Sequence, residues 1–391
     1  MMRMTALCCL LLGGLATSPA PAAEAPAFLL VGLDGKTFFE AGGDRNGPDG
    51  RDAVAIVDVS DEARPALAHT LALDNSVYGP PTNLQITPDG RLGLVASSVT
   101  MRQEGAAWYA QADDRLHVID LAANPPRVVE TLRVGRQPSG LAIDRTGARA
   151  LIANREGRSV TLLTIAGSTV RVAGQVEVGD EAAAVAFAPD GRRAFVAKNK
   201  AGKVGVIALD GTALVYDPAK DMPVGAGTYG LEVAPNGALA LAGNTGSAPS
   251  DGHADSVSVI RTDGARPRVV DHLGVGDTPE ALAIAPDGRH AAVSVVRGAA
   301  APHASPGYTP TGTVLLLAID PDGGVRRVGE AEAGAVTQGI AFSPSGQYVY
   351  VGNYVDRTLG VYRVEGDAIR DTGFRLALPG QPASLRGRAG G

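Results

Sequence analysis

A turn-bearing frame recurs along this chain and is clearest over Val178–Leu209. The frame is a glycine, a short gap, a small-apolar run, a Pro-Asp-Gly turn, and two alternating apolar runs separated by a polar break. Alternation with a period of two is typical of strands, and Pro-Asp-Gly is typical of tight turns. The turn glycines that mark the six copies are Gly90, Gly147, Gly191, Gly237, Gly288 and Gly346. All-strand repeats of this length predict a propeller or a solenoid.

Each copy holds four strand candidates, which favours the propeller. In the unit around Gly191 they are Ala183–Ala188, Arg193–Lys198, Lys203–Leu209 and Thr212–Val224. Four antiparallel strands, repeated radially, form a propeller blade. A solenoid would need shorter and more uniform repeats with capping ends. The 51 glycines and 26 prolines fit such a turn-rich, all-β chain. Residues 24–391 are therefore predicted to form one domain.

Strand material is left over at both ends, and the two pieces complement each other. Ala27–Leu33 and Ala53–Val59 look like the second and third strands of a unit that lacks its first strand. Pro379–Leu385 copies Val134–Leu141, which begins a complete unit. A seventh blade assembled from both termini would close the ring and remove an exposed sheet edge. The alternative is that the final residues, 376–391, form only a ragged tail.

The repeats resemble those of a known family. Val275–Val295 and Ile340–Val361 are similar to the YVTN-type β-propeller repeat, whose family lies near the seven-bladed lactonase and carboxymuconate-cyclase propellers. The resemblance implies a seven-bladed fold over nearly the whole chain. It does not imply one reaction, because blade-building residues define the family.

The first 23 residues have the features of an export signal. Arg3 precedes the apolar stretch Thr5–Thr17, and small residues follow, which predicts cleavage near Ala22 or Ala23 and a periplasmic or secreted protein. The apolar stretch is shorter than a membrane span. Both cysteines of the chain lie within this segment. The mature protein would then have no disulfide and no thiolate chemistry.

The charge of the chain argues against some partners. The formal net charge is -6, and no basic run occurs, so neither nucleic acid nor an anionic membrane is suggested as a partner. We expect a monomer that binds a protein or a small ligand.

The extra residues between copies are concentrated in one connection, the one between the second and third strands. In an antiparallel blade this connection lies on the face opposite the Pro-Asp-Gly turns, so we predict one binding face. Trp108 and Tyr109, in the second insertion, are the candidates for partner contacts. Alternatively, Trp108 folds back onto its own blade, or the insertions are merely solvated. The insertions are Asp34–Asp52, Ser97–Arg115, Asn244–Asp255 and Val296–Gly312.

One residue per innermost strand is expected at the channel mouth on this face. Glu280 is the only carboxylate of that ring and could orient a ligand or act as a general base. Tyr229 and Gln338 of the ring, with Glu181 just outside it, are further candidates for ligand binding. The full ring is Thr82, Ser139, Ala183, Tyr229, Glu280, Gln338 and Ala383.

Two metal sites are considered. Oxygen ligands at calcium-like spacing occur at Asp44, Asn46, Asp49 and Asp52, although the downstream bidentate acid is absent, and a polar turn is the alternative. His253, Asp255 and His303 come from long loops of adjacent blades and could converge on a transition metal; solvent exposure is the alternative. No cofactor is predicted.

Two functions follow from these residues. The favoured one is an exported propeller whose long-loop face binds a protein partner or a small ligand. The alternative is a lactonase-like or cyclase-like enzyme that uses Glu280, an arginine and a histidine such as His303 at the channel mouth. Catalysis needs acid, base and oxyanion donors in one pocket. Because no histidine occurs in the ring, the sequence favours binding.

Overall fold

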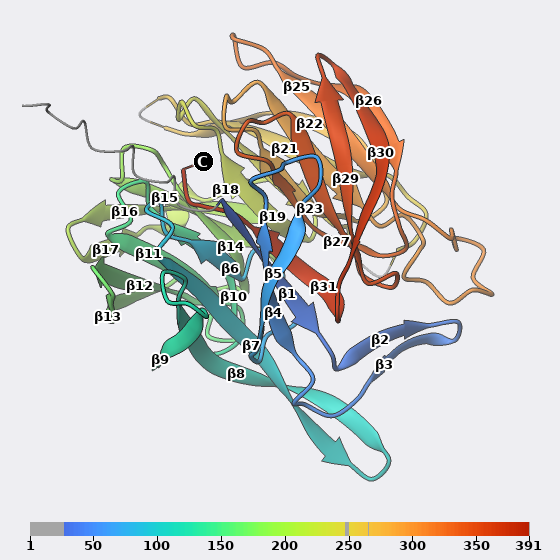
Figure 1. Ribbon diagram of the computed structural model, residues 1–391. Coiled ribbons are helices and arrows are strands. Elements are labelled where there is room, and N and C mark those ends of the chain that lie inside the picture. The colour runs from blue at the N-terminus through green and yellow to red at the C-terminus, as the bar shows by residue number, and fades with distance from the viewer. Residues whose placement is uncertain (1–26, 247–249, 265, 391) are drawn as a thin grey trace, which may run out of the picture.

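The structure, a computed structural model, describes residues 27–246, 250–264 and 266–390. The expected signal segment lies outside this part of the chain. Seven antiparallel blade sheets, six with four strands and one with a fifth strand added, are arranged in a ring (Figure 1), which confirms the predicted seven-bladed propeller. No helix in the described ranges has both the length and the apolarity to cross a bilayer.

Each blade runs from its innermost to its outermost strand, and blade one combines the two ends of the chain. Blade one contains β31 (Gln381–Arg386), β1 (Phe28–Asp34), β4 (Ala53–Asp58) and β5 (Ala66–Ala72). Blade two contains β6 (Leu84–Ile86), β7 (Leu92–Glu104), β8 (Ala107–Asp120) and β9 (Arg127–Arg133). Blade three contains β10 (Pro138–Ile143), β11 (Arg149–Asn154), β12 (Ser159–Ala166) and β13 (Thr169–Glu177).

The other four blades repeat the pattern. Blade four contains β14 (Ala182–Phe187), β15 (Arg193–Lys198), β16 (Lys203–Asp210) and β17 (Ala213–Tyr216), with β18 (Met222–Pro223) also on β16. Blade five contains β19 (Thr228–Val233), β20 (Leu239–Asn244), β21 (Asp255–Arg261) and β22 (Arg268–Gly276). Blade six contains β23 (Pro279–Ile284), β24 (His290–Val295), β25 (Thr313–Ile319) and β26 (Val325–Glu332). Blade seven contains β27 (Thr337–Phe342), β28 (Tyr348–Asn353), β29 (Thr358–Glu365) and β30 (Ala368–Ala377).

The C-terminal strand closes the ring as the sequence predicts. β31 pairs with β1, and Leu385 lies opposite Val31, both fully buried. The alternative of a ragged tail is wrong for this strand. The chain then continues along blade two, where Ile86 receives a hydrogen bond from Ala389 and donates one to Gly387. The last described residues therefore lie at the channel rather than away from the disc.

The core consists of layers between neighbouring blades, and strand alternation builds them. Ile152 packs in the layer between blades two and three, whereas the adjacent Leu151 packs in the layer between blades three and four. Both are fully buried because each blade is covered on both faces. The six marker glycines all have positive φ, between 64° at Gly191 and 75° at Gly90, which explains glycine at these turns.

Two details differ from the sequence-based expectation. Ser97–Arg115 is not a loop, because β7 and β8 continue through it as one long hairpin, with Gln103 opposite Trp108. Cross-strand pairing satisfies the backbone there, so the extension remains regular beyond the disc (Figure 1). The expected strand Thr212–Val224 is broken by a 3-10 turn, Pro218–Lys220, between β17 and β18.

The insertions share one face, as the blade topology requires, and they contact one another. The first contains the hairpin β2 (Thr37–Glu40) and β3 (Gly43–Asn46). Its tip meets the blade-six insertion, where the His303 amide donates to the Ala41 carbonyl at 2.9 Å. Asp49 accepts a hydrogen bond from the Met101 amide, at 2.8 Å, on the blade-two hairpin. The insertions of blades six, one and two thus form a connected wall.

Candidate ligand site at the channel mouth

The channel mouth on the long-loop face brings together polar side chains from several blades. Glu280 is the second residue of β23, Gln338 the second of β27 and Tyr229 the second of β19. Each innermost strand begins at this face, so its second residue is placed at the channel. Arg155 directly follows β11, and Glu181 directly precedes β14. The blade repeat thus delivers all five residues to one rim.

Glu280 is a buried carboxyl group with little to stabilise its charge. Its residue exposure is 8%. Burial raises the pKa of Glu280 to about 7, and only a side-chain hydrogen bond from Gln338 and the charge of Arg155 oppose the rise. A carboxyl group with a pKa near neutrality can both accept and donate a proton at physiological pH.

Arg155 supplies the positive charge of the site. Its Nη2 lies 3.3 Å from Oε2 of Glu181, and its guanidinium carbon is 5.8 Å from the ring centroid of Tyr229. Burial and the charge of Glu280 raise the pKa of Tyr229, so its hydroxyl stays protonated; a backbone hydrogen bond from Gly79 acts in the opposite direction. The rim therefore offers an arginine that is paired with Glu181, one neutral hydroxyl and one titratable acid.

Several polar atoms at this mouth have no hydrogen-bond partner. They are Thr82 Oγ1, Ser139 Oγ, Gln338 Oε1 and Arg155 Nε, all inaccessible to bulk solvent. Buried polar groups in native proteins are nearly always satisfied by protein, water or ligand. Four such atoms around one mouth indicate a place where a polar molecule or ordered water completes the structure.

The aromatic candidates lie away from this mouth. Trp108 and Tyr109 sit near the tip of the β7–β8 hairpin, where Tyr109 is 50% exposed and Trp108 is partly buried. Their partners in the ladder are Gln103 and Arg102, so neither ring returns to the channel. They remain candidates for partner contacts.

The histidine candidates do not form a metal centre in the described residues. His303 lies in the joint between insertions, and its ring centroid is 4.3 Å from that of Tyr308. Asp255 accepts a hydrogen bond from the Thr278 amide at 2.9 Å, and His253 lies on the exposed blade-five insertion. Within 27–246, 250–264 and 266–390, no three His, Cys, Asp or Glu side chains gather as metal ligands.

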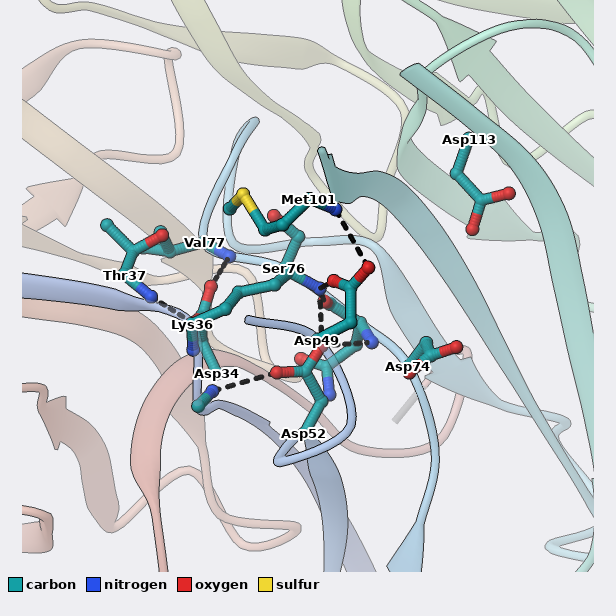
Figure 2. A network of polar contacts seen from close by, with 12 residues as sticks. Asp34, Lys36, Thr37, Asp49, Asp52, Asp74, Ser76, Val77, Met101 and Asp113 are labelled. Atoms are coloured by element: carbon teal, nitrogen blue, oxygen red, sulfur yellow. Dashed lines mark hydrogen bonds and ion pairs between the residues drawn. The ribbon is translucent and has the colours of Figure 1, made fainter. Parts of the chain in front are cut away.

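The four calcium candidates are also separated. Asp44 is exposed on β3, and the Asn46 amide donates to the Tyr78 hydroxyl at 3.1 Å. Asp49 and Asp52 instead flank the ammonium group of Lys36, which is ion-paired with Asp52 (Figure 2). A lysine thus occupies the position between carboxylates that a cation site would need.

We define the Lys36 network as Asp34, Lys36, Asp49, Asp52 and Asn75. Lys36 donates to Asp52 and to the Asn75 carbonyl, while the amides of Gly35 and Asn75 donate to Asp52. Asp34 accepts from the amides of Lys36, Thr37 and Val77 (Figure 2). These bonds attach the first insertion to blade one.

Sequence reasoning missed Arg155 as a site residue. Attention to long insertions favoured blades one, two, five and six, whereas Arg155 lies in the short connection of blade three. One signal was present: Arg155 follows Asn154, the residue that ends the second strand of a blade. The residue directly after this strand lies close to the end of the blade that faces the rim, whether the connection that follows is short or long.

The fold, but not the function, is supported by comparison with known proteins. No protein-family model matches the sequence, and no curated protein matches it. Among solved structures, a putative 6-phosphogluconolactonase from Bacteroides uniformis has a TM-score of 0.70 at 16% identity, covering 93% of this chain and 100% of that one. The periplasmic gluconolactonase of Pseudomonas aeruginosa has a TM-score of 0.62 at 19% identity, covering 93% and 99%.

A third similar structure is that of a different kind of protein. Hydrazine synthase from Kuenenia stuttgartiensis has a TM-score of 0.56 at 20% identity, covering 74% of this chain and 78% of that one. Since these proteins differ in kind while the architecture is shared, the likeness concerns the fold. The chain is a seven-bladed propeller whose fold is similar to that of these structures.

Proposed function

We propose that this propeller binds a small polyhydroxylated carboxylate at the channel mouth of its long-loop face. The observation that carries the proposal is the set of unpartnered polar atoms around Glu280, Arg155 and Tyr229. Arg155 suits a carboxylate, and Thr82 and Ser139 suit hydroxyl groups. The similar fold of the periplasmic gluconolactonase of Pseudomonas aeruginosa makes gluconate the first ligand to test.

Calorimetric titration with gluconate tests binding. Wild-type protein is expected to bind, and Arg155→Gln is expected to weaken binding at least about tenfold, equivalent to about 1.4 kcal/mol. Arg136→Gln is the matched control, because Arg136 pairs with Glu156 on the exposed surface of the same blade. Equal affinities for wild type and Arg155→Gln, or no saturable binding to wild type, would overturn the proposal.

A second function, lactone hydrolysis at the same mouth, is favoured by the near-neutral pKa of Glu280. The Glu280 carboxylate would take a proton from water as the water oxygen bonds to the lactone carbonyl carbon. Arg155 would stabilise the resulting oxyanion. The ring C–O bond would then break as Glu280 returns the proton to the leaving oxygen, giving the hydroxy acid.

Base titration of gluconolactone opening separates the two functions. Hydrolysis above the uncatalysed rate that falls about a hundredfold or more in Glu280→Gln would support the enzyme. Gluconate binding without faster ring opening would support a binding protein. Turnover that persists in Glu280→Gln would contradict the catalytic role of Glu280.

We further propose export to the periplasm or medium through residues 1–23, and a monomeric state. The N-terminal charge, apolar stretch and small residues support export. The YVTN-type repeat assignment is likewise a proposal, supported by the buried Asn154, Asn244 and Asn353 that end equivalent strands.

A further inference from the structure

A cavity of about 750 Å³ opens on the face opposite the long loops. It lies where the innermost strands end, and every blade contributes to its wall. Its volume falls within the usual range of small-molecule sites, about 300–1,000 Å³. We call it the turn-face basin, because the Pro-Asp-Gly turns surround it.

Partly exposed aromatic and aliphatic side chains line the basin. Three of the seven phenylalanines of the chain face it, from blades one, four and seven. A ring of separate apolar side chains, of which all but the buried Ile143 are partly accessible, is a surface that an apolar ligand body can cover. The apolar lining includes Phe28, Ile143, Phe187, Val233, Ile284 and Phe342.

An ion pair crosses the basin floor. Arg386, at the end of β31, pairs with Glu232 of blade five, and its Nη1 donates to the Leu141 carbonyl of blade three at 2.9 Å. The side chains are 13% and 19% exposed. Arg386 thus spans three blades and is held rigidly in position.

A second arginine lies on the rim of the basin. Arg145 is exposed and donates to the Pro235 carbonyl of blade five, and in the described part of the chain it makes no ion pair. Its side chain also lies against Gly390, with Cγ 3.5 Å from the position a Cβ would take there. Three arginines and two glutamates are among the described residues that line the basin.

We propose that the turn-face basin binds an organic monoanion with an apolar body, such as an aromatic or medium-chain carboxylate or sulfonate. The apolar ring covers the body of the ligand. Arg145 exchanges a neutral carbonyl for the anionic group, a stronger charge-assisted contact. Arg386 remains paired with Glu232 beneath it. This site is separate from the channel mouth of the long-loop face.

Fluorescence titration with anilinonaphthalene sulfonate tests the proposal. Wild-type protein is expected to bind it at a single saturable site, and decanoate is expected to compete better than decanol, which lacks the charge. Arg145→Gln is expected to weaken binding at least about tenfold. Phe187→Ala is expected to weaken it as well, through loss of apolar contact.

Two matched variants locate the site. Arg192→Gln removes an exposed arginine from a turn of the same face, and Arg155→Gln alters the opposite mouth; neither is expected to change binding of the probe. Arg145→Gln should unfold as wild type does in chemical denaturation, because Arg145 is exposed.

Energy transfer gives an independent readout. The single Trp108 lies on the other face, so Phe187→Trp in a Trp108→Phe background places a donor at the basin. Quenching of this donor by the bound probe is expected. Unchanged binding in Arg145→Gln, equal competition by decanol, loss of binding in Arg155→Gln, or absence of transfer would each overturn the proposal. Gluconate binding at the long-loop face is measured separately, so the two proposals can fail independently.

Discussion

Two regions of the long-loop face bury carboxyl groups but give them different hydrogen-bond and charge partners. In the Lys36 network, every carboxylate oxygen of Asp34 and Asp52 accepts a hydrogen bond, and Lys36 supplies the counter-charge (Figure 2). At the channel mouth, Glu280 has one side-chain hydrogen bond, from Gln338, and the charge of Arg155 nearby. Both regions raise a pKa: that of Asp52 to about 6 and that of Glu280 to about 7, burial being the main cause in each.

The difference indicates what each region is for. The bonds of the Lys36 network hold an insertion on the blade, and among its five residues only Asn75 Oδ1 is buried without a partner. The unpartnered polar atoms at the channel mouth can form hydrogen bonds with a bound molecule, because no protein group uses them. Two carboxyl groups with similar shifts therefore predict different responses to mutation, to pH and to ligand.

The largest expected effect is that of Lys36→Met. This change leaves Asp34 and Asp52 buried without a counter-charge, and breaking a buried pair typically costs about 3–5 kcal/mol. Denaturant unfolding should show a loss of that size at pH 8 and a smaller loss at pH 5, where Asp52 can protonate. Lys220→Met is the control, since the Lys220–Asp217 pair is exposed and should contribute within about 1 kcal/mol. A loss no larger than in this control would contradict the structural role of the network.

The next effect is the pH dependence that Glu280 confers. Its pKa rises from 4.5 in the unfolded chain to about 7 in the folded protein. The folded state therefore binds the proton more tightly, and this contribution to stability is present below pH 4.5 and is lost as pH rises through 7. Relative to wild type, Glu280→Gln should gain up to about 3 kcal/mol of unfolding free energy between pH 4 and 8. Parallel stability curves for the two proteins would show that Glu280 is not perturbed.

The smallest effect compares two threonines by the same substitution. Thr161 Oγ1 accepts from the Asn154 amide at 2.9 Å, whereas Thr82 Oγ1 at the mouth has no partner. Thr161→Val should cost about 1–2 kcal/mol, because it leaves a buried donor unsatisfied. Thr82→Val should be neutral or slightly stabilising, yet should weaken gluconate binding. Equal costs in thermal unfolding would mean that the mouth is satisfied by tightly held water rather than open to a ligand.

Much of the architecture could be predicted from local patterns, because strand alternation and turn chemistry are local. The frame around Gly191 predicted three of its four strands to within one residue at each end. It failed where an insertion changed the pairing: Thr212–Val224 is interrupted by a 3-10 turn, and Ser97–Arg115 is a paired hairpin. Loop length alone does not show whether two halves of an insertion pair with each other.

The candidate site could be predicted only in part. The ring position of Glu280 followed from the repeat register, but its surroundings depend on other blades, which supply Gln338, Arg155 and Tyr229. Arg155 was overlooked because its connection is short, and the calcium interpretation overlooked Lys36, which is distant in sequence from Asp49 and Asp52 but adjacent in space. Which carboxylate meets a cation depends on how the first insertion folds back on itself and, at the channel mouth, on contacts between blades.

By itself, the sequence determined a closed ring of seven blades, the seam between its two ends and the common face of its insertions. Period-two alternation, turn glycines and complementary terminal fragments are sufficient for that, since each acts within a blade or across one seam. Only the tertiary structure decided which charges meet: Arg155 with Glu181, Lys36 with Asp52, and Arg386 with Glu232. The first and third pairs join different blades, so the geometry of the ring selects their partners, whereas Lys36 and Asp52 meet because the first insertion folds back on itself.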